Sequence, residues 1–204
     1  MTERWESSAA DLGRRLYPML NCLVAPRPIA WVSTVDAAGA VNLAPHSYFT
    51  VASAVPAVLQ FTSLGRKDSL RNIEATGEFV VNVAPWSLRD QVNLTSIDAP
   101  AGVDELALAG LTMQPSRTVR PPRVAQSPAA AECRLLEVRS FGDGPMSGHV
   151  VFGEVLQVAV DPAVMADDGL PDLRLLDSAA RGDRMNWYRL GDPEPIERPS
   201  WQPR

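Results

Sequence analysis

Short runs of apolar, β-branched and aromatic residues recur along the chain, separated by turn-forming residues. The run Ile29–Val35 (IAWVSTV) leads into a turn at Asp36–Gly39, and an extended pattern resumes at Val41. This arrangement predicts a β-hairpin. Four more runs, each bounded by turn formers, are Pro56–Thr62, Glu78–Val83, Ala131–Phe141 and Gly148–Val160. Together these runs predict a mainly β protein with an antiparallel barrel or sandwich.

Two short helices are predicted between these strands. One covers Asp68–Ala75 with Asp68 as its N-cap, and the other covers Ser87–Leu94 with Ser87 as its N-cap. Prolines interrupt the segment Thr95–Pro128, which we expect to run over the surface. The tail Pro193–Arg204 contains four prolines and no apolar period. It is either disordered or an arm that lies across a neighbouring subunit.

Composition places the chain among globular proteins and excludes several functions. Of its 204 residues, 46% are hydrophobic and 21% are charged, so we expect one domain over residues 1–204 with its own core. The net charge of −5 argues against nucleic acid as a partner. The polar N-terminus and the lack of a long apolar run argue against a signal peptide and a membrane partner, so a cytoplasmic location is expected.

Metal and disulfide chemistry are also not expected. Cys22 and Cys133 lie far apart without a CxxC spacing, and both are interpreted as buried small hydrophobic residues. His46 and His149 are the two histidines of the chain, too few for a histidine-rich metal site.

Candidate chemistry begins in the segment Arg27–Phe49. Small and polar residues occur where strands could otherwise be wholly apolar, namely Ser33, Thr34, Asn42, Ala44 and Ser47. Hydroxyl, amide and backbone groups can bond the edge of a heteroaromatic ring, while a small alanine lets the ring approach closely. The alternative is an ordinary strand whose Ser and Thr side chains point outward.

A second cluster begins at Ser63 and continues into the predicted helix. Hydroxyl groups and cations stand together in Ser63, Arg66, Lys67 and Ser69. At a helix N-terminus, unpaired N–H groups and the helix dipole favour an anion, so the cluster is a candidate phosphate site. The alternative is a solvated basic loop before a capped helix. Neither a Walker A loop nor a GxGxxG turn is present.

The two clusters together resemble the flavin reductase-like family. The matching stretches are Arg27–Thr34 (RPIAWVST), Asn42–Pro45 (NLAP), Lys67–Ser69 (KDS), Asn72-Ile73, Glu78–Asn82 and the later Gly148-His149 and Gly153–Val155. They occur in the family's order between Tyr17 and Val160. The resemblance implies an FMN-binding split β-barrel of Greek-key type with short peripheral helices.

The resemblance also implies roles for particular residues. The isoalloxazine and ribityl parts of FMN, or of FAD, would be contacted, partly through backbone groups, by Ser33, Thr34, Asn42, Ala44 and Ser47. Ser63, Arg66, Lys67 and Ser69 would hold the phosphate. His149 would lie in the nicotinamide pocket, unless it is a barrel-strand histidine bonded to the backbone. His46 would lie at the rim of the pocket or at a dimer interface.

The activity implied is hydride transfer from NAD(P)H to flavin, which needs no catalytic side chain. The expected assembly is a homodimer, and reduced flavin would be supplied to a partner monooxygenase. A flavoprotein that holds FMN tightly and transfers electrons without using NAD(P)H directly is the main alternative. A split-barrel oxidase, a haem-binding relative and a non-enzymatic scaffold are further ones.

Ser47 is a candidate donor that tunes the reduced flavin. The loop with Arg117, Arg120 and Arg123 is interpreted as a solvated basic loop rather than a phosphate site. The segment Arg184–Arg189 is interpreted as an interface or ring-stacking segment, unless Trp187 and Tyr188 cap the barrel core.

Overall fold

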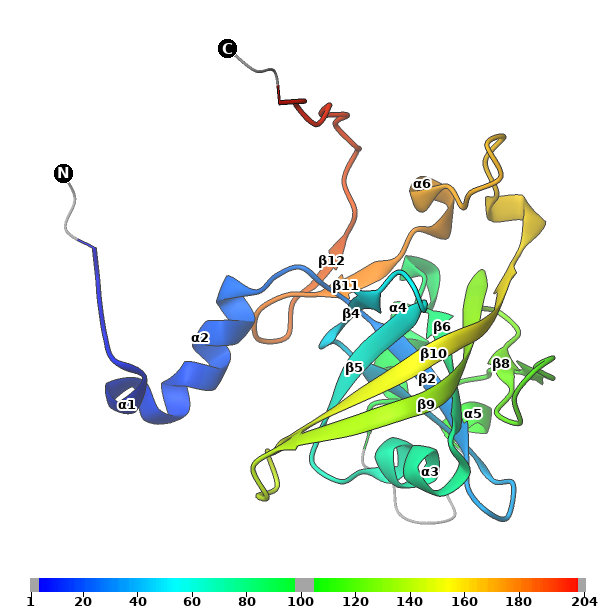
Figure 1. The fold of residues 1–204 in the computed structure, drawn as a ribbon, viewed down its shortest axis with the longest axis horizontal. Coiled ribbons are helices and arrows are strands. Elements are labelled where there is room, and N and C mark those ends of the chain that lie inside the picture. The colour runs from blue at the N-terminus through cyan, green and yellow to red at the C-terminus, as the bar shows by residue number, and fades with distance from the viewer. Residues whose placement is uncertain (1–3, 98–104, 202–204) are drawn as a thin grey trace.

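The computed structural model describes residues 4–97 and 105–201, and its main element is a seven-stranded antiparallel sheet. In spatial order its strands are β3 (Val41–His46), β2 (Ala30–Val35), β6 (Glu78–Val83), β9 (Ala129–Phe141), β10 (Gly148–Val160), β5 (Val58–Leu64) and β4 (Phe49–Ser53). The sheet curls so that β3 also contacts β5, which lies near the other edge (Figure 1). This closure makes a barrel with a gap between β3 and β5.

Smaller elements surround this barrel. A second sheet contains β1 (Arg27–Pro28), β11 (Ala179–Arg181) and β12 (Trp187–Arg189), and a two-stranded sheet pairs β7 (Met113–Gln114) with β8 (Arg123–Val124). The α-helices are α1 (Ala9–Leu12), α2 (Leu16–Leu23), α3 (Asp68–Thr76), α4 (Arg89–Leu94), α5 (Glu105–Leu108) and α6 (Leu173–Leu176). Figure 1 shows that α1, α2 and the segment after β12 project from the barrel. No helix in the described residues is long and apolar enough to cross a membrane.

The predicted β-hairpin is confirmed. β2 pairs with β3 from Ala30 opposite His46 to Val35 opposite Val41, and the predicted bounds of β6 and β10 agree with the structure. The strand β4 was not predicted, because its residues Thr50, Val51 and Ala52 are exposed at a sheet edge and carry no apolar alternation.

Both predicted helices form, but their N-caps differ from the prediction. Lys67, not Asp68, is the N-cap of α3, and the Asp68 carboxylate instead pairs with Arg71. The second segment divides into a 3₁₀ turn at Trp86–Leu88 and α4, whose N-cap is Leu88 rather than Ser87. The predicted capping roles of Asp68 and Ser87 are therefore wrong.

Strand β2 is buried on both of its faces. Ala30 and Val32 pack with Phe61 and Phe79 in one core cluster, whereas Trp31 packs in a second cluster. The indole Nε1–H of Trp31 donates to Thr95 Oγ1 at 2.9 Å, which satisfies its polar atom. Because both faces of β2 are buried, the strand carries mainly apolar residues and no charged ones.

The two cysteines differ in their surroundings. Cys133 is buried in the barrel, as predicted, and burial raises the pKa of its thiol to about 12. Cys22 is exposed on α2, so its predicted burial is wrong. The error arose because α2 projects away from the core that would have covered it.

Candidate functional site

A cavity of about 540 Å³ opens where the edge strand β3 approaches β5. Its walls come from β3, from the end of β5, from the loop into α3, and from residues of α2 and β11. The predicted site residues Asn42, Ala44, Ser47, Ser63, Arg66, Lys67 and Ser69 all line it. The structure therefore brings seven of the sequence-predicted residues into one hollow.

Strand β3 supplies one wall through alternate residues. Asn42, Ala44 and His46 lie on one face because side chains along a strand alternate between faces. Ala44 leaves the middle of this wall open, since it carries one methyl group. Ser47 follows directly where the strand ends. The wall thus alternates small and hydrogen-bonding groups.

The loop Ser63–Asp68 forms another wall and is held firmly. Ser63 Oγ donates to the Gly65 carbonyl at 3.0 Å, and the Gly65 N–H donates to the Ser147 carbonyl at 2.9 Å. Gly65 has φ +76°, and a Cβ there would lie 2.7 Å from the Pro145 carbonyl oxygen. Glycine is thus required at this position by both backbone conformation and space.

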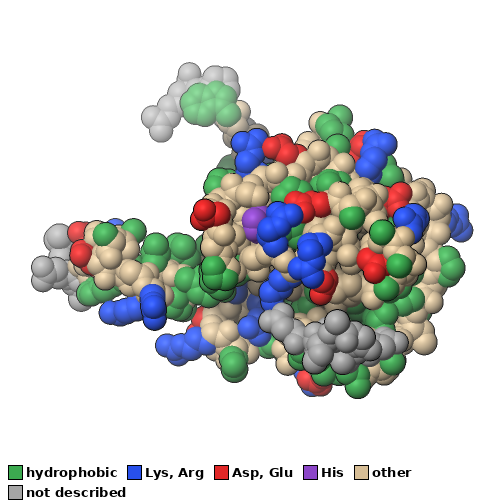
Figure 2. Space-filling model, turned by 90° about the horizontal axis from the view of Figure 1, so that it is seen from below, with side chains coloured by type: hydrophobic (Ala, Val, Ile, Leu, Met, Phe, Trp, Pro, Cys, Tyr) green, Lys and Arg blue, Asp and Glu red, His purple; other side chains and the backbone are tan. Residues whose placement is uncertain are grey.

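The first turn of α3 adds the positive end of a helix to this wall. Within the part of the chain that the structure describes, no side chain caps the helix at Lys67, so no capping side chain from these residues occupies the backbone N–H groups of the first turn. Arg66 and Lys67 precede the helix, and Arg66 also pairs with Glu74. Lys and Arg side chains gather on the face shown in Figure 2. This end of the cavity has the groups that bind a phosphate.

His46 places an unpartnered acceptor at the cavity. The residue is 9% exposed, its ring centroid lies 4.6 Å from that of Phe61, and its buried Nε2 has no hydrogen-bond partner among the described residues. Burial lowers the pKa of His46 from 6.5 to about 4, although a backbone hydrogen bond with Thr62 opposes this shift. The imidazole is therefore neutral at pH 7.

Ser33 and Thr34 do not line the cavity. Ser33 lies on the Trp31 face of β2, where its hydroxyl donates to the Pro122 carbonyl at 2.6 Å. Thr34 lies on the opposite face, and its Oγ1 accepts from Asn72 Nδ2 at 3.0 Å. Adjacent residues of a strand point to opposite faces, so the two hydroxyls cannot share one ligand surface. Contacts of these two residues with flavin, partly through backbone groups, stay a prediction.

His149 also lies outside the cavity lining. It is 4% exposed on β10, with Nδ1 2.8 Å from Ser140 Oγ and Nε2 3.0 Å from Ser147 Oγ. Ser147 is also the residue whose carbonyl holds Gly65. His149 therefore braces the Ser63–Asp68 loop through Ser147, with side chains rather than backbone as its partners, and its place in a nicotinamide pocket stays a prediction.

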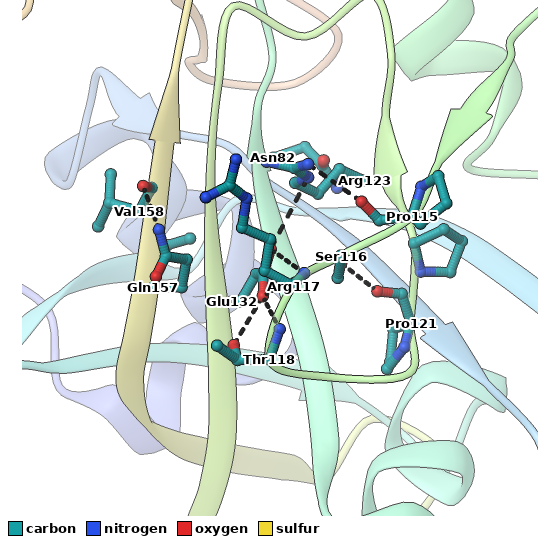
Figure 3. Close-up of polar contacts among 12 residues, drawn as sticks. Asn82, Pro115, Ser116, Arg117, Thr118, Pro121, Arg123, Glu132, Gln157 and Val158 are labelled. Carbon is teal, nitrogen blue, oxygen red and sulfur yellow. Dashed lines mark hydrogen bonds and ion pairs between the residues drawn. The ribbon is translucent and has the colours of Figure 1, made fainter.

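The arginine loop before β9 is held by a buried carboxylate. Glu132 accepts from the N–H of Arg117 and from both the N–H and hydroxyl of Thr118, and Arg123 Nε lies 3.8 Å away (Figure 3). Burial raises the pKa of Glu132, but these hydrogen bonds and Arg123 outweigh it, so the pKa lies below its ordinary value. None of the three loop arginines lines the cavity.

Sequence reasoning missed the part of the cavity formed by distant segments. Tyr17 and Asn21 come from α2, Arg27 from β1, and Arg181 and Arg184 from the region of β11. The cluster of arginines and aromatic residues at Arg184–Arg189 was the one available signal. It did not reveal that β11 pairs with β1 beside the predicted site.

The fold has counterparts among known proteins. Residues 23–175 match the family model described as a flavin reductase like domain. An uncharacterized protein of Aquifex aeolicus is 35% identical over 161 residues, which cover 76% of this chain and 80% of that protein. The structure of nitrilotriacetate monooxygenase component B from Bacillus cereus has a TM-score of 0.90 at 26% identity, covering 96% of this chain and 100% of that chain.

A Shewanella frigidimarina protein, whose structure is described as having a split barrel domain, has a TM-score of 0.84 at 22% identity. That match covers 95% of this chain and 99% of the other chain. This chain, with residues 23–175 matched by the family model, belongs to the flavin reductase-like domain family, and its fold is the FMN-binding split barrel. The resemblance stated from the sequence motifs is thus confirmed at the level of family and fold.

Proposed function

We propose that the protein is an oxidoreductase that binds FMN in the cavity between β3 and β5 and transfers a hydride to it from NAD(P)H. The observation that carries this proposal is the meeting, in one cavity, of a neutral hydrogen-bonding wall on β3 and a cationic loop at the N-terminus of α3. The cavity volume of about 540 Å³ lies in the range of small-molecule sites.

The residues present fit FMN at both of its ends. Arg66, Lys67 and Ser69, with the uncapped N–H groups of α3, would hold the phosphate. The unpartnered His46 Nε2 offers a hydrogen bond to the polar edge of the ring, Ala44 leaves room beside it, and Asn42, which bonds to Ser69, would lie beside the ribityl chain. Because buried polar atoms are normally paired, the unpartnered His46 Nε2 supports the presence of a ligand whose N–H group donates a hydrogen bond to it.

Bound flavin supplies the hydride-accepting ring, so the protein itself needs to bind, align and shield the reactants. The end of β5 forms part of the cavity wall, and His46 would stay uncharged beside the ring at neutral pH. Ser47 offers a hydroxyl at the end of β3, where it can tune the bound flavin by hydrogen bonding. No side chain is assigned as an acid or base.

The proposed assembly is a homodimer that passes reduced flavin to a monooxygenase. Tyr17, Leu20, Leu23 and Val24 are exposed on and after α2, which projects from the barrel (Figure 1). Large apolar side chains gathered on a projecting helix favour burial against a second copy. The Bacillus cereus neighbour is component B of a monooxygenase, which supports the role of a supplying reductase.

Titration with FMN and with riboflavin, followed by assays of NADH and NADPH oxidation, tests the proposal. We expect FMN to bind more tightly than riboflavin, because riboflavin lacks the phosphate, and at least one nucleotide to be oxidised in the presence of FMN. Equal affinity for the two flavins would contradict the phosphate site. Flavin binding without oxidation of either nucleotide would contradict the reductase activity and favour an electron-transfer role.

A further inference from the structure

Two arginines face each other across the small sheet beside the cavity. Arg27 of β1 is the direct antiparallel partner of Arg181 of β11. Like charges directly opposite each other in a sheet are destabilising. Both side chains line the cavity. Such a pair is explained most simply if an anion binds between the charges.

Arg27 is buried without a carboxylate partner. It is 7% exposed, and its guanidinium donates to three carbonyls, those of Asn21 at 2.7 Å, Val24 at 2.6 Å and Gly182 at 2.7 Å. Its Nε is buried and has no partner. Within residues 4–97 and 105–201, no Asp or Glu lies within 4.0 Å of Arg27 or Arg181. The positive charge of the pair is therefore not neutralised by these residues.

Arg181 is positioned by its neighbours but remains open to a ligand. Its Nη2 donates to the Arg184 carbonyl at 3.1 Å, and its guanidinium lies 5.1 Å from the Trp187 ring centroid. Burial, and then the charge of Arg27, lowers the pKa of Arg181. Arg181 also lines an adjoining hollow of about 210 Å³ with Trp187. The nearby Asp183 accepts hydrogen bonds from Asn186 and Tyr188 instead.

This pair lies toward the other end of β3 from the first turn of α3. Asn42, opposite Thr34, bonds to Ser69 of α3, whereas His46 is opposite Ala30, three residues after Arg27. At about 3.3 Å per residue, Asn42 and His46 are about 13 Å apart along the strand. The first turn of α3 and the arginine pair thus lie toward opposite ends of the β3 wall.

We propose that Arg27 and Arg181 form a second anion subsite, which binds a phosphate oxyanion of the nicotinamide nucleotide while the flavin phosphate occupies the Ser63–Asp68 loop. The inference rests on the proposed function, because it assigns the first cationic end to FMN. The oxyanion belongs either to the pyrophosphate, which NADH and NADPH share, or to the 2′-phosphate, which only NADPH carries.

The test compares nucleotides with a hydride donor that has no phosphate. The KM values of NADH, NADPH and 1-benzyl-1,4-dihydronicotinamide are measured at saturating FMN for the wild type, Arg181→Gln and Arg181→Lys. Arg174→Gln, at an exposed arginine paired with Asp172, serves as the control. Loss of one charge-assisted hydrogen bond raises KM about tenfold. We expect that rise for Arg181→Gln with a nucleotide, no change with the phosphate-free donor, and partial recovery in Arg181→Lys.

The pattern of the change identifies the oxyanion. A rise for both NADH and NADPH assigns the pyrophosphate, and a rise for NADPH alone assigns the 2′-phosphate. An equal rise for the phosphate-free donor, or weaker FMN binding with unchanged nucleotide KM, would overturn the subsite. Arg27→Lys gives a second variant, because it keeps the charge but loses the guanidinium bonds to the Asn21, Val24 and Gly182 carbonyls.

If the wild type oxidises neither nucleotide, the proposed function fails but the subsite is still decided. Inorganic pyrophosphate is then added to flavin-free Lys67→Gln protein, whose first anion site is weakened. The subsite is supported if pyrophosphate raises the Tm of the Lys67→Gln protein, does not raise it in the double variant that also carries Arg181→Gln, and raises it again in the double variant that carries Arg181→Lys. No rise, or the same rise in both double variants, would overturn it.

Discussion

Asn42 Nδ2 donates a hydrogen bond to Ser69 Oγ at 3.0 Å, which joins strand β3 to the first turn of α3. The two residues are 27 positions apart and belong to the two clusters that the sequence singles out. Because this bond brings the clusters together, the wall that would face the flavin ring and the loop that would hold its phosphate are parts of one cavity.

Lys67→Gln will weaken FMN binding and leave riboflavin binding unchanged. The variant removes a positive charge beside the α3 N-terminus, where a phosphate would gain a charge-assisted hydrogen bond. We expect the Kd for FMN to rise about tenfold. Flavin fluorescence titrations measure both constants, and Lys67→Arg should largely restore FMN affinity. An equal loss for riboflavin would show that Lys67 does not act on the phosphate.

Ala44→Leu will block flavin binding without unfolding the barrel. The Ala44 side chain is half-buried on the β3 wall, and three added carbon atoms would fill the space beside the ring. Titration should show at least a tenfold rise in Kd for both FMN and riboflavin, because the obstruction acts on the shared ring. Ala38→Leu, in the exposed turn after β2, should bind flavin normally. Unchanged binding by Ala44→Leu would place the ring elsewhere.

His46 will make stability depend on pH between about 6.5 and 4. The pKa of His46 is about 4 in the folded protein and 6.5 in an exposed histidine, so the unfolded chain binds more protons in this window. The free energy of unfolding should therefore fall as pH falls, with a slope of up to about 1.4 kcal/mol per pH unit. Urea unfolding at several pH values should show that His46→Gln lacks this part of the slope. Identical slopes in both proteins would contradict the buried neutral imidazole.

Glu132→Gln will destabilise the protein at neutral pH and less so in acid. The carboxylate is fully buried and accepts hydrogen bonds from Arg117 and Thr118, which an amide cannot match (Figure 3). A cost of about 1–3 kcal/mol is expected at pH 7. Because the pKa of Glu132 is lowered in the folded state, this advantage is present above pH 4.5 and is lost as pH falls below it. A difference that is constant between pH 7 and pH 3 would contradict this account.

The sequence predicted the barrel well where strands are buried. β2 and β6 carry runs of apolar residues that are largely buried, and the bounds predicted for them and for β10 agree with the structure to within one residue. The edge strand β4 has no such pattern, and the three-residue strands β11 and β12 depend on long-range pairing with β1. Short strands of this kind are stabilised by partners that local sequence does not specify.

The candidate site was predictable as clusters but not in its geometry. Motifs identified Asn42, Ala44 and Lys67, which line the cavity. The alternation of side chains along β2 placed Ser33 and Thr34 on opposite faces, and the β9–β10 hairpin enclosed His149. A β-branched or hydroxyl residue on a doubly buried strand gives no sign of which face it occupies. The facing pair of Arg27 and Arg181 could be found only from the register of β1 and β11.

The most direct test of the flavin site and its reaction is an absorbance spectrum from 300 to 550 nm under anaerobic conditions, recorded with FMN bound and again after NADH and then NADPH is added. Our account predicts a flavin band, shifted from that of free FMN, that bleaches with at least one nucleotide. A protein that leaves the spectrum of added FMN unchanged and reduces none of it would contradict the account.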